Sequence, residues 1–112
     1  MALWFLRGLR RGVVTTRYPK AVEDWASSLP TPPAFRPELL TPELVDRLVE
    51  LCPAPALRRD DETLVVDLGA CLACGLCIRE GGPAVTPSGV WELAVRERSA
   101  LVQRIPIAGA VT

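Results

Sequence analysis

The four cysteines of this 112-residue chain are the residues whose type and spacing point most directly to chemistry. Cys71, Cys74 and Cys77 form a C-x2-C-x2-C run, and Cys52 stands alone before Pro53. The chain has no histidine, which excludes imidazole as an acid–base catalyst or a metal ligand. Thiolates bind zinc and iron–sulfur clusters. The cysteines therefore predict a metal centre, and no catalytic residues are predicted.

The spacing favours iron–sulfur over zinc. Zinc sites usually pair two C-x2-C knuckles, whereas three cysteines in consecutive steps reach three corners of a cubane. Bacterial ferredoxins carry C-x2-C-x2-C-x3-C-P, in which the fourth cysteine binds the cluster of the other half. We therefore predict that Cys52, Cys71, Cys74 and Cys77 are the metal ligands and the cofactor-binding residues of one [4Fe–4S] cluster. A zinc ion and unligated or disulfide-bonded thiols are the alternatives.

The positions that would bind a second cluster carry no thiol. Counted with ferredoxin spacing from Cys52 and Cys77, they hold Pro42, Val45, Leu48 and Gly81. Because one ligand set is complete and the other is wholly absent, the sequence predicts a two-cluster ferredoxin reduced to one cluster.

The charges of the chain are unevenly distributed. Five of the 13 basic residues and none of the 13 acidic ones lie in residues 1–20, which leaves eight bases against 13 acids in the rest. A basic arm on an acidic body does not suit a nucleic-acid partner, whose basic footprint would cover the folded domain. It suits an arm that lies on an anionic membrane or an acidic partner.

No apolar run is long enough to cross a bilayer, and Met1–Leu6 is followed by arginines rather than by a signal-peptide cleavage site. An N-terminus rich in arginine and poor in acids is also typical of a mitochondrial transit peptide. Thiols in ligand spacing without a secretion signal favour a reducing compartment.

The N-terminal part of the chain is expected to lie outside the folded domain. Residues 2–13 fit an amphipathic basic helix, either a docking element or a helix packed on its own domain. Residues 13–19 are rich in β-branched side chains and predict an extended segment. We divide the region into a docking arm (1–20) and a proline-rich extended strap (21–41) without regular elements.

Residues 42–104 are expected to form a single-cluster domain of the α+β class, followed by a loose tail over 105–112. Thr41 and Pro42 predict a helix start, with Leu44, Val45, Leu48 and Leu51 on its apolar face. The other expected elements are a hairpin over 55–67, the cluster loop 69–77, a strand pair between 84–86 and 90–95, and a helix over 96–104.

Three stretches resemble a known family: Gly12-Val-Val-Thr-Thr-Arg-Tyr-Pro19, the cysteine motifs with Asp67-Leu-Gly-Ala-Cys71, and Trp91-Glu-Leu-Ala-Val95. They are similar to the ferredoxin-like iron–sulfur subunit of formate hydrogenlyase and other membrane-bound group 4 [NiFe]-hydrogenases, which is itself similar to chain I of respiratory complex I. The resemblance covers about two-thirds of the chain and departs from the family at the first cluster motif.

The resemblance implies a bacterial ferredoxin-like, pseudo-twofold fold and an electron-transfer subunit of an oxidoreductase complex. Its partners would be the small subunit beside the catalytic centre, neighbouring hydrophilic and membrane subunits, and the membrane surface through the arm. The expected location is the cytoplasmic face of the membrane, or the matrix side in mitochondria. A structural subunit stapled by a cluster or zinc, and a free one-cluster ferredoxin, are the alternatives.

Overall fold

The computed structural model describes residues 3–12, 14–15, 17–21 and 24–108, and it has the mixed helix-and-sheet composition of the α+β class. Its helices are α1 (Leu3–Arg11), α2 (Pro42–Leu51) and α3 (Leu76–Glu80), and its strands are β1 (Pro33–Phe35), β2 (Leu57–Asp60), β3 (Thr63–Asp67), β4 (Val85–Pro87) and β5 (Val102–Pro106). Short 3-10 turns are η1 (Asp24–Ser28), η2 (Pro37–Leu39), η3 (Gly82–Ala84) and η4 (Arg98–Leu101). None of the helices in the described ranges has the length and apolar character that crossing a bilayer requires.

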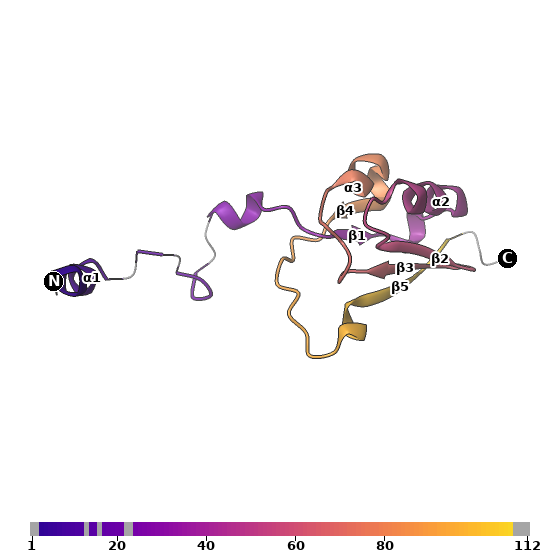
Figure 1. Ribbon diagram of the computed structural model, residues 1–112. Coiled ribbons are helices and arrows are strands. Elements are labelled where there is room, and N and C mark those ends of the chain that lie inside the picture. Colours follow the sequence, from indigo (N-terminus) through magenta and orange to yellow (C-terminus); the bar gives the residue numbers. More distant parts are fainter. Residues whose placement is uncertain (1–2, 13, 16, 22–23, 109–112) are drawn as a thin grey trace.

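The body of the molecule consists of two strand–helix–strand units in succession, β1–α2–β2 and β3–α3–β4. The two outer strands pair with each other, with Pro33 opposite Pro87 and Phe35 opposite Val85. The two inner strands form the antiparallel hairpin β2–β3, and β5 adds to the other edge of β3. Both helices lie on the same side of the three-stranded sheet (Figure 1).

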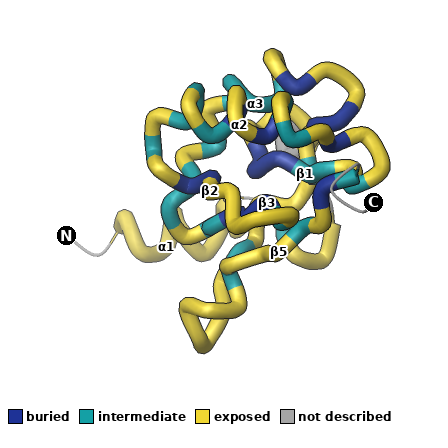
Figure 2. The backbone as a smooth tube through the Cα atoms, turned by 90° about the vertical axis from the view of Figure 1, so that its right-hand side faces the viewer, coloured by how far each residue is buried: buried dark blue, intermediate teal, exposed yellow. Residues whose placement is uncertain are grey.

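Helix α2 begins where the sequence predicts. The Thr41 hydroxyl caps it by accepting a hydrogen bond from the Leu44 N–H at 3.3 Å, and Pro42 occupies the first turn. The helical period places Val45 and Leu48 on one face, and both are fully buried. Figure 2 shows buried backbone concentrated between the helices and the sheets. The core cluster is Leu40, Val45, Leu48, Leu57, Leu64, Val66, Ala84, Val85 and Ile107.

The proline-rich segment is more ordered than predicted. Instead of a strap without regular elements, it contains η1, β1 and η2, and Pro32 and Pro33 are buried. The expected pairing of 84–86 with 90–95 is wrong, because β4 pairs with β1 and residues 90–95 form no strand. Pro33 begins β1 and Pro87 ends β4. Both strands are edge strands of a two-stranded sheet, where a residue without an N–H is tolerated.

The C-terminal part also differs from the expectation. The helix predicted over 96–104 is only the turn η4, and residues 102–106 pair with the free edge of β3 instead. The predicted loose tail is wrong for Ile105 to Ile107, since the first two residues of that stretch end β5 and Ile107 is buried in the core. Residues 109–112 of the tail lie outside the described ranges.

The N-terminal helix is confirmed as α1, whose residues are all exposed and none of which is buried against the body. It projects from the body, and the chain measures 72 × 28 × 24 Å along its principal axes (Figure 1). The extended segment predicted for 13–19 includes Val13 and Thr16, which lie outside the described ranges. Its last two residues, Tyr18 and Pro19, belong to a turn, and the centre of the Tyr18 ring lies 5.0 Å from that of Trp91.

Candidate metal centre

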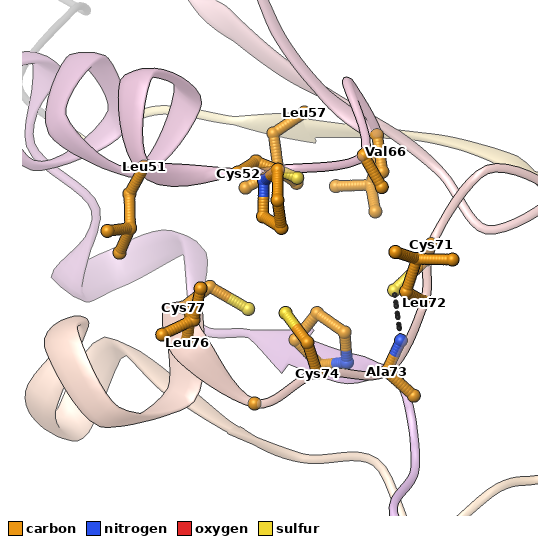
Figure 3. Close-up of a pocket in the computed structure, with 15 residues that line it drawn as sticks. Leu51, Cys52, Leu57, Val66, Cys71, Leu72, Ala73, Cys74, Leu76 and Cys77 are labelled. Carbon is orange, nitrogen blue, oxygen red and sulfur yellow. Dashed lines mark hydrogen bonds between the residues drawn. The ribbon is translucent and has the colours of Figure 1, made fainter.

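All four cysteines line one pocket between the end of α2, the hairpin and the start of α3. Their sulfurs point toward the same open space, with Cys52 across it from Cys74 and Cys77 (Figure 3). The other lining residues are uncharged: Pro33, Leu51, Pro53, Ala54, Ala56, Leu57, Val66, Leu72, Ala73, Gly75 and Leu76. The fold thus brings together the four residues that the sequence predicts as ligands.

Cys52 is positioned by the end of α2. It is the C-cap residue, and its N–H donates to the Leu48 carbonyl at 3.1 Å. Pro53 follows and cannot continue the helix, so the chain leaves the helix axis directly after the thiol. The helix end therefore holds this sulfur at the pocket, 19 positions before the next cysteine in the sequence.

The loop that carries the other three cysteines is anchored at Asp67. One carboxylate oxygen accepts from the Gly69 N–H at 2.9 Å, and the other accepts from the Arg98 guanidinium at 2.9 Å. The Asp67 carbonyl also accepts from the N–H groups of Ala70 and Cys71. Asp67 thus holds the turn between β3 and the first loop cysteine through both its side chain and its carbonyl.

Two residues with positive φ wind the loop around the pocket. Ala73 has φ 51°, and Gly75 has φ 79° as the residue that precedes α3. A left-handed conformation costs a residue with a Cβ about 1 kcal/mol, whereas glycine adopts it freely. The Ala73 N–H points back and donates to the Cys71 sulfur at 3.4 Å. The strained residue therefore supplies an amide to a thiol.

Two groups of the site have perturbed pKa values. The hydrogen bond from Arg98 is the main cause that holds the pKa of Asp67 below its usual range. Burial raises the pKa of the Cys77 thiol, and the charges of Cys71, Cys74 and Cys52 raise it further. Since all three other thiols act on Cys77, four thiolates would repel one another here unless a cation neutralised them.

Three of the four positions where ferredoxin spacing would put a second ligand set, Val45, Leu48 and Gly81, are buried. Val45 and Leu48 are core residues of α2, and Pro42 is its first residue. Gly81 is buried, and a Cβ at this position would lie 2.3 Å from Val85 Cγ2 and 2.7 Å from the Cys77 carbonyl oxygen. A cysteine side chain could not enter this position without moving its neighbours.

Sequence reasoning missed the contributions of Asp67, Arg98 and Ala73. Asp67 lies two positions before Gly69 at the start of the cysteine loop, and an aspartate in this position could have been predicted to accept a hydrogen bond from the loop backbone. Arg98 was hidden by the incorrect helix prediction, and no feature of the sequence marks Ala73 as left-handed.

Within the described part of the chain, no group of three or more His, Cys, Asp or Glu side chains is arranged to hold a single metal ion. No family model and no curated protein matches the sequence.

Proposed function

We propose that the chain is an electron-transfer subunit that carries one [4Fe–4S] cluster in a membrane-associated, hydrogenase-like or complex I-like oxidoreductase. The observation that carries this proposal is the meeting of Cys52, from the end of α2, with the three loop cysteines in one uncharged pocket. When bound, such a cluster takes up and releases single electrons, and the four thiolates hold it.

The donor set fits a cluster. A single zinc ion needs every sulfur about 2.3 Å from one point, whereas a cubane presents a separate iron to each thiolate and spans a wider space. The Ala73 N–H at the Cys71 sulfur supports the same assignment, since hydrogen bonds to the sulfurs tune the potentials of these clusters. The glycine with positive φ before α3 lets the backbone pass close to the pocket.

We further propose that the fold is ferredoxin-like with pseudo-twofold symmetry. Support comes from the two strand–helix–strand units and from the pairing of outer with outer and inner with inner strands. Cys52 and Gly81 are the C-cap residues of α2 and α3, so they occupy equivalent places in the two units. These are the places of the fourth ligand in each ferredoxin motif.

The packing supports a single cluster. Val45 and Leu48 fill the side of α2 where a second ligand loop would stand, and Gly81 has no room for a thiol. The space of the second site is thus occupied by the core of the domain.

The arm supports attachment to a larger assembly. In α1, Trp4, Phe5 and Leu9 are exposed beside Arg10 and Arg11. An apolar face bordered by arginines is the pattern of a helix in a membrane interface. We propose that the arm binds the membrane surface on the cytoplasmic or matrix side, while the body contacts the small subunit and its neighbours.

A structural role for the same centre is the second candidate. It is favoured by Cys52, because a metal that joins the end of α2 to the loop before α3 would staple the two units together. The two roles differ in redox activity. An electron-transfer subunit requires that the bound cluster be reversibly reduced by one electron by a reductant of physiological strength, whereas a purely structural centre does not.

The first experiment determines the cofactor. The chain is purified without oxygen, iron and acid-labile sulfide are assayed, and the reduced sample is examined by electron paramagnetic resonance. We expect four irons and four sulfides per chain with one cluster signal. Eight irons per chain, or one zinc without sulfide, would contradict the proposal.

The second experiment tests the ligand that is distant in sequence. Because all four thiolates hold one group, Cys52→Ser should lower the iron content and stability of the cluster about as much as Cys74→Ser does. If Cys52→Ser leaves the spectrum and the stability of the cluster unchanged, Cys52 is not a ligand and the crossed ferredoxin scheme does not apply.

A further inference from the structure

The four thiols of the pocket differ in their access to solvent. Cys74 is exposed, whereas Cys52, Cys71 and Cys77 are partly buried. A dissolved oxidant reacts preferentially with the thiol that it can reach, because a partly buried sulfur is shielded by its neighbours. Cys74 is therefore the cysteine at which oxidation of this site would begin.

The geometry of the loop gives Cys74 one partner thiol. The sulfurs of Cys74 and Cys77 point toward each other, and Cys52 lies across the pocket from both (Figure 3). Between them the backbone turns at Gly75, which has φ 79°, and the Arg79 N–H donates to the Gly75 carbonyl at 3.0 Å in the first turn of α3. Because this turn begins directly after Cys74, it brings Cys77 back to the side of the loop on which Cys74 lies.

Cys71 has the same spacing from Cys74 but is held in a different way. Its sulfur accepts a hydrogen bond from the Ala73 N–H at 3.4 Å, and its own N–H donates to the Asp67 carbonyl at 3.2 Å. Residues 71–75 form no helical turn that would bring this sulfur round to the next cysteine. Cys71 is thus anchored to the end of β3, whereas Cys74 and Cys77 belong to the start of α3.

We propose that Cys74 and Cys77 form a reversible disulfide in the chain that carries no metal, with glutathione disulfide as the oxidant. The thiolate of Cys74 attacks one sulfur of glutathione disulfide and releases one molecule of glutathione. The thiolate of Cys77 then attacks the Cys74 sulfur and releases the second molecule. Two cysteine thiols are oxidised, one glutathione disulfide is reduced to two thiols, and the two protons of the cysteines end on glutathione.

The disulfide has a consequence for the loading of the metal centre. It removes two of the four ligands, so the chain takes up a cluster only after a dithiol has reduced the bond again. It also protects the exposed Cys74 from oxidation to a sulfinic acid, which is irreversible in most proteins. The effect on loading depends on the proposed function, whereas the disulfide itself does not.

The first test maps the disulfide in the full-length chain. Metal is removed under reducing conditions, the chain is incubated anaerobically with glutathione disulfide, free thiols are blocked with iodoacetamide, and the oxidised ones are labelled with N-ethylmaleimide after reduction. Trypsin leaves Cys52 on one peptide and the other three cysteines on a second, where fragment ions separate them. Cys74 and Cys77 should gain the second label together. The Cys71–Cys74 pair should be about tenfold rarer, because a disulfide outside its preferred geometry is strained.

Two variants and a denatured sample serve as controls. Cys71→Ser should form the disulfide as fast as the unmodified chain, whereas Cys77→Ser should retain glutathione on Cys74 because no second thiol displaces it. In concentrated urea the two C-x2-C pairs close loops of equal length, so they should form about equally. Equal pairing without urea, or pairing of Cys74 chiefly with Cys71 or Cys52, overturns the proposal.

The second test measures loading. Oxidised and reduced samples receive stoichiometric ferrous iron and sulfide, and the cluster absorbance is followed. The oxidised chain should assemble its cluster about tenfold more slowly, since thiol–disulfide exchange must come first, and prior treatment with dithiothreitol should restore the rate. Equal rates overturn the effect on loading. Failure of the reduced chain to assemble any cluster would instead contradict the proposed function, and the disulfide map would still stand.

Discussion

Gly81, one of the four positions where ferredoxin spacing would put a second ligand set, offers a sharp test of how that region is packed. A Cβ at this position would lie 2.3 Å from Val85 Cγ2 and 2.8 Å from Val85 Cβ, far inside contact distance. It would also meet the Cys77 carbonyl, which accepts the Gly81 N–H at 2.8 Å. The backbone of Gly81 has φ −82°, which any residue adopts, so Gly81→Ala acts through crowding alone.

Overpacking of a well-packed core costs about 1–3 kcal/mol. We expect Gly81→Ala to lower the free energy of unfolding by about 2 kcal/mol, which corresponds to a decrease of roughly 1 M in the urea midpoint at a typical slope. Circular dichroism of the anaerobically purified chain in urea measures the midpoint, and the cluster absorbance reports in parallel whether Cys77 is displaced.

A double mutant separates crowding from other effects. Val85→Ala alone removes buried methyl groups and is expected to destabilise, but it also clears the space that the new Cβ needs. The combination should therefore lose less stability than the two single changes together, with a coupling of about 1 kcal/mol or more. Gly8→Ala is the control, since nothing lies within 4 Å of its Cβ position. Additive losses, or an unchanged midpoint for Gly81→Ala, would refute the packing argument.

Three further predictions concern the core, the loop anchor and the arm. Leu48→Ala should lower the free energy of unfolding by about 2–5 kcal/mol because it leaves a cavity in the core, and Thr41→Ala should lower it by about 1 kcal/mol through loss of the helix cap; urea titration measures both. Asp67→Asn, which removes the charged partner of Arg98, should accelerate loss of iron to a chelator relative to the unmodified chain, and equal rates would show that the loop holds without this anchor. Deleting residues 2–19 should leave cluster content unchanged but abolish sedimentation with anionic vesicles, and binding by the full chain should weaken with salt; undiminished sedimentation of the truncated chain would show that the arm is not the membrane-binding element.

Local sequence signals predicted local structure well. The threonine–proline start of α2, its helical spacing of apolar residues and the hairpin over 55–67 all depend on contacts within about twenty residues, and all are confirmed. The pairing of β1 with β4 joins residues fifty or more positions apart, and no feature of either three-residue strand specifies the other. Arg96–Arg104 has helical charge spacing, but the edge of β3 offers pairing partners, so only the short turn η4 forms and residues 102–104 join β5.

The candidate site shows the same difference between local signals, which the sequence reveals, and tertiary contacts, which it does not. The spacing of Cys71, Cys74 and Cys77 within one loop could be interpreted directly from the sequence, and Cys52 could be added only because the ferredoxin motif crosses between halves. The geometry that completes the pocket, namely the left-handed Ala73 and the ion pair between Asp67 and Arg98, depends on tertiary contacts.

The strand order β2–β3–β5 has a consequence for self-association. Within the described residues, neither β2 nor β5 has a second neighbour in the sheet, and exposed strand edges are a common route to aggregation between copies of a chain. Arg58 and Arg59 lie on β2, and Arg104 and the terminal Pro106 lie on β5. Charged side chains at these edges would have to lose hydration if a second copy joined, and the proline offers no N–H to a neighbouring strand. The sheet is thus protected at both edges, so the chain can present apolar surface elsewhere without extending its sheet from one copy to the next.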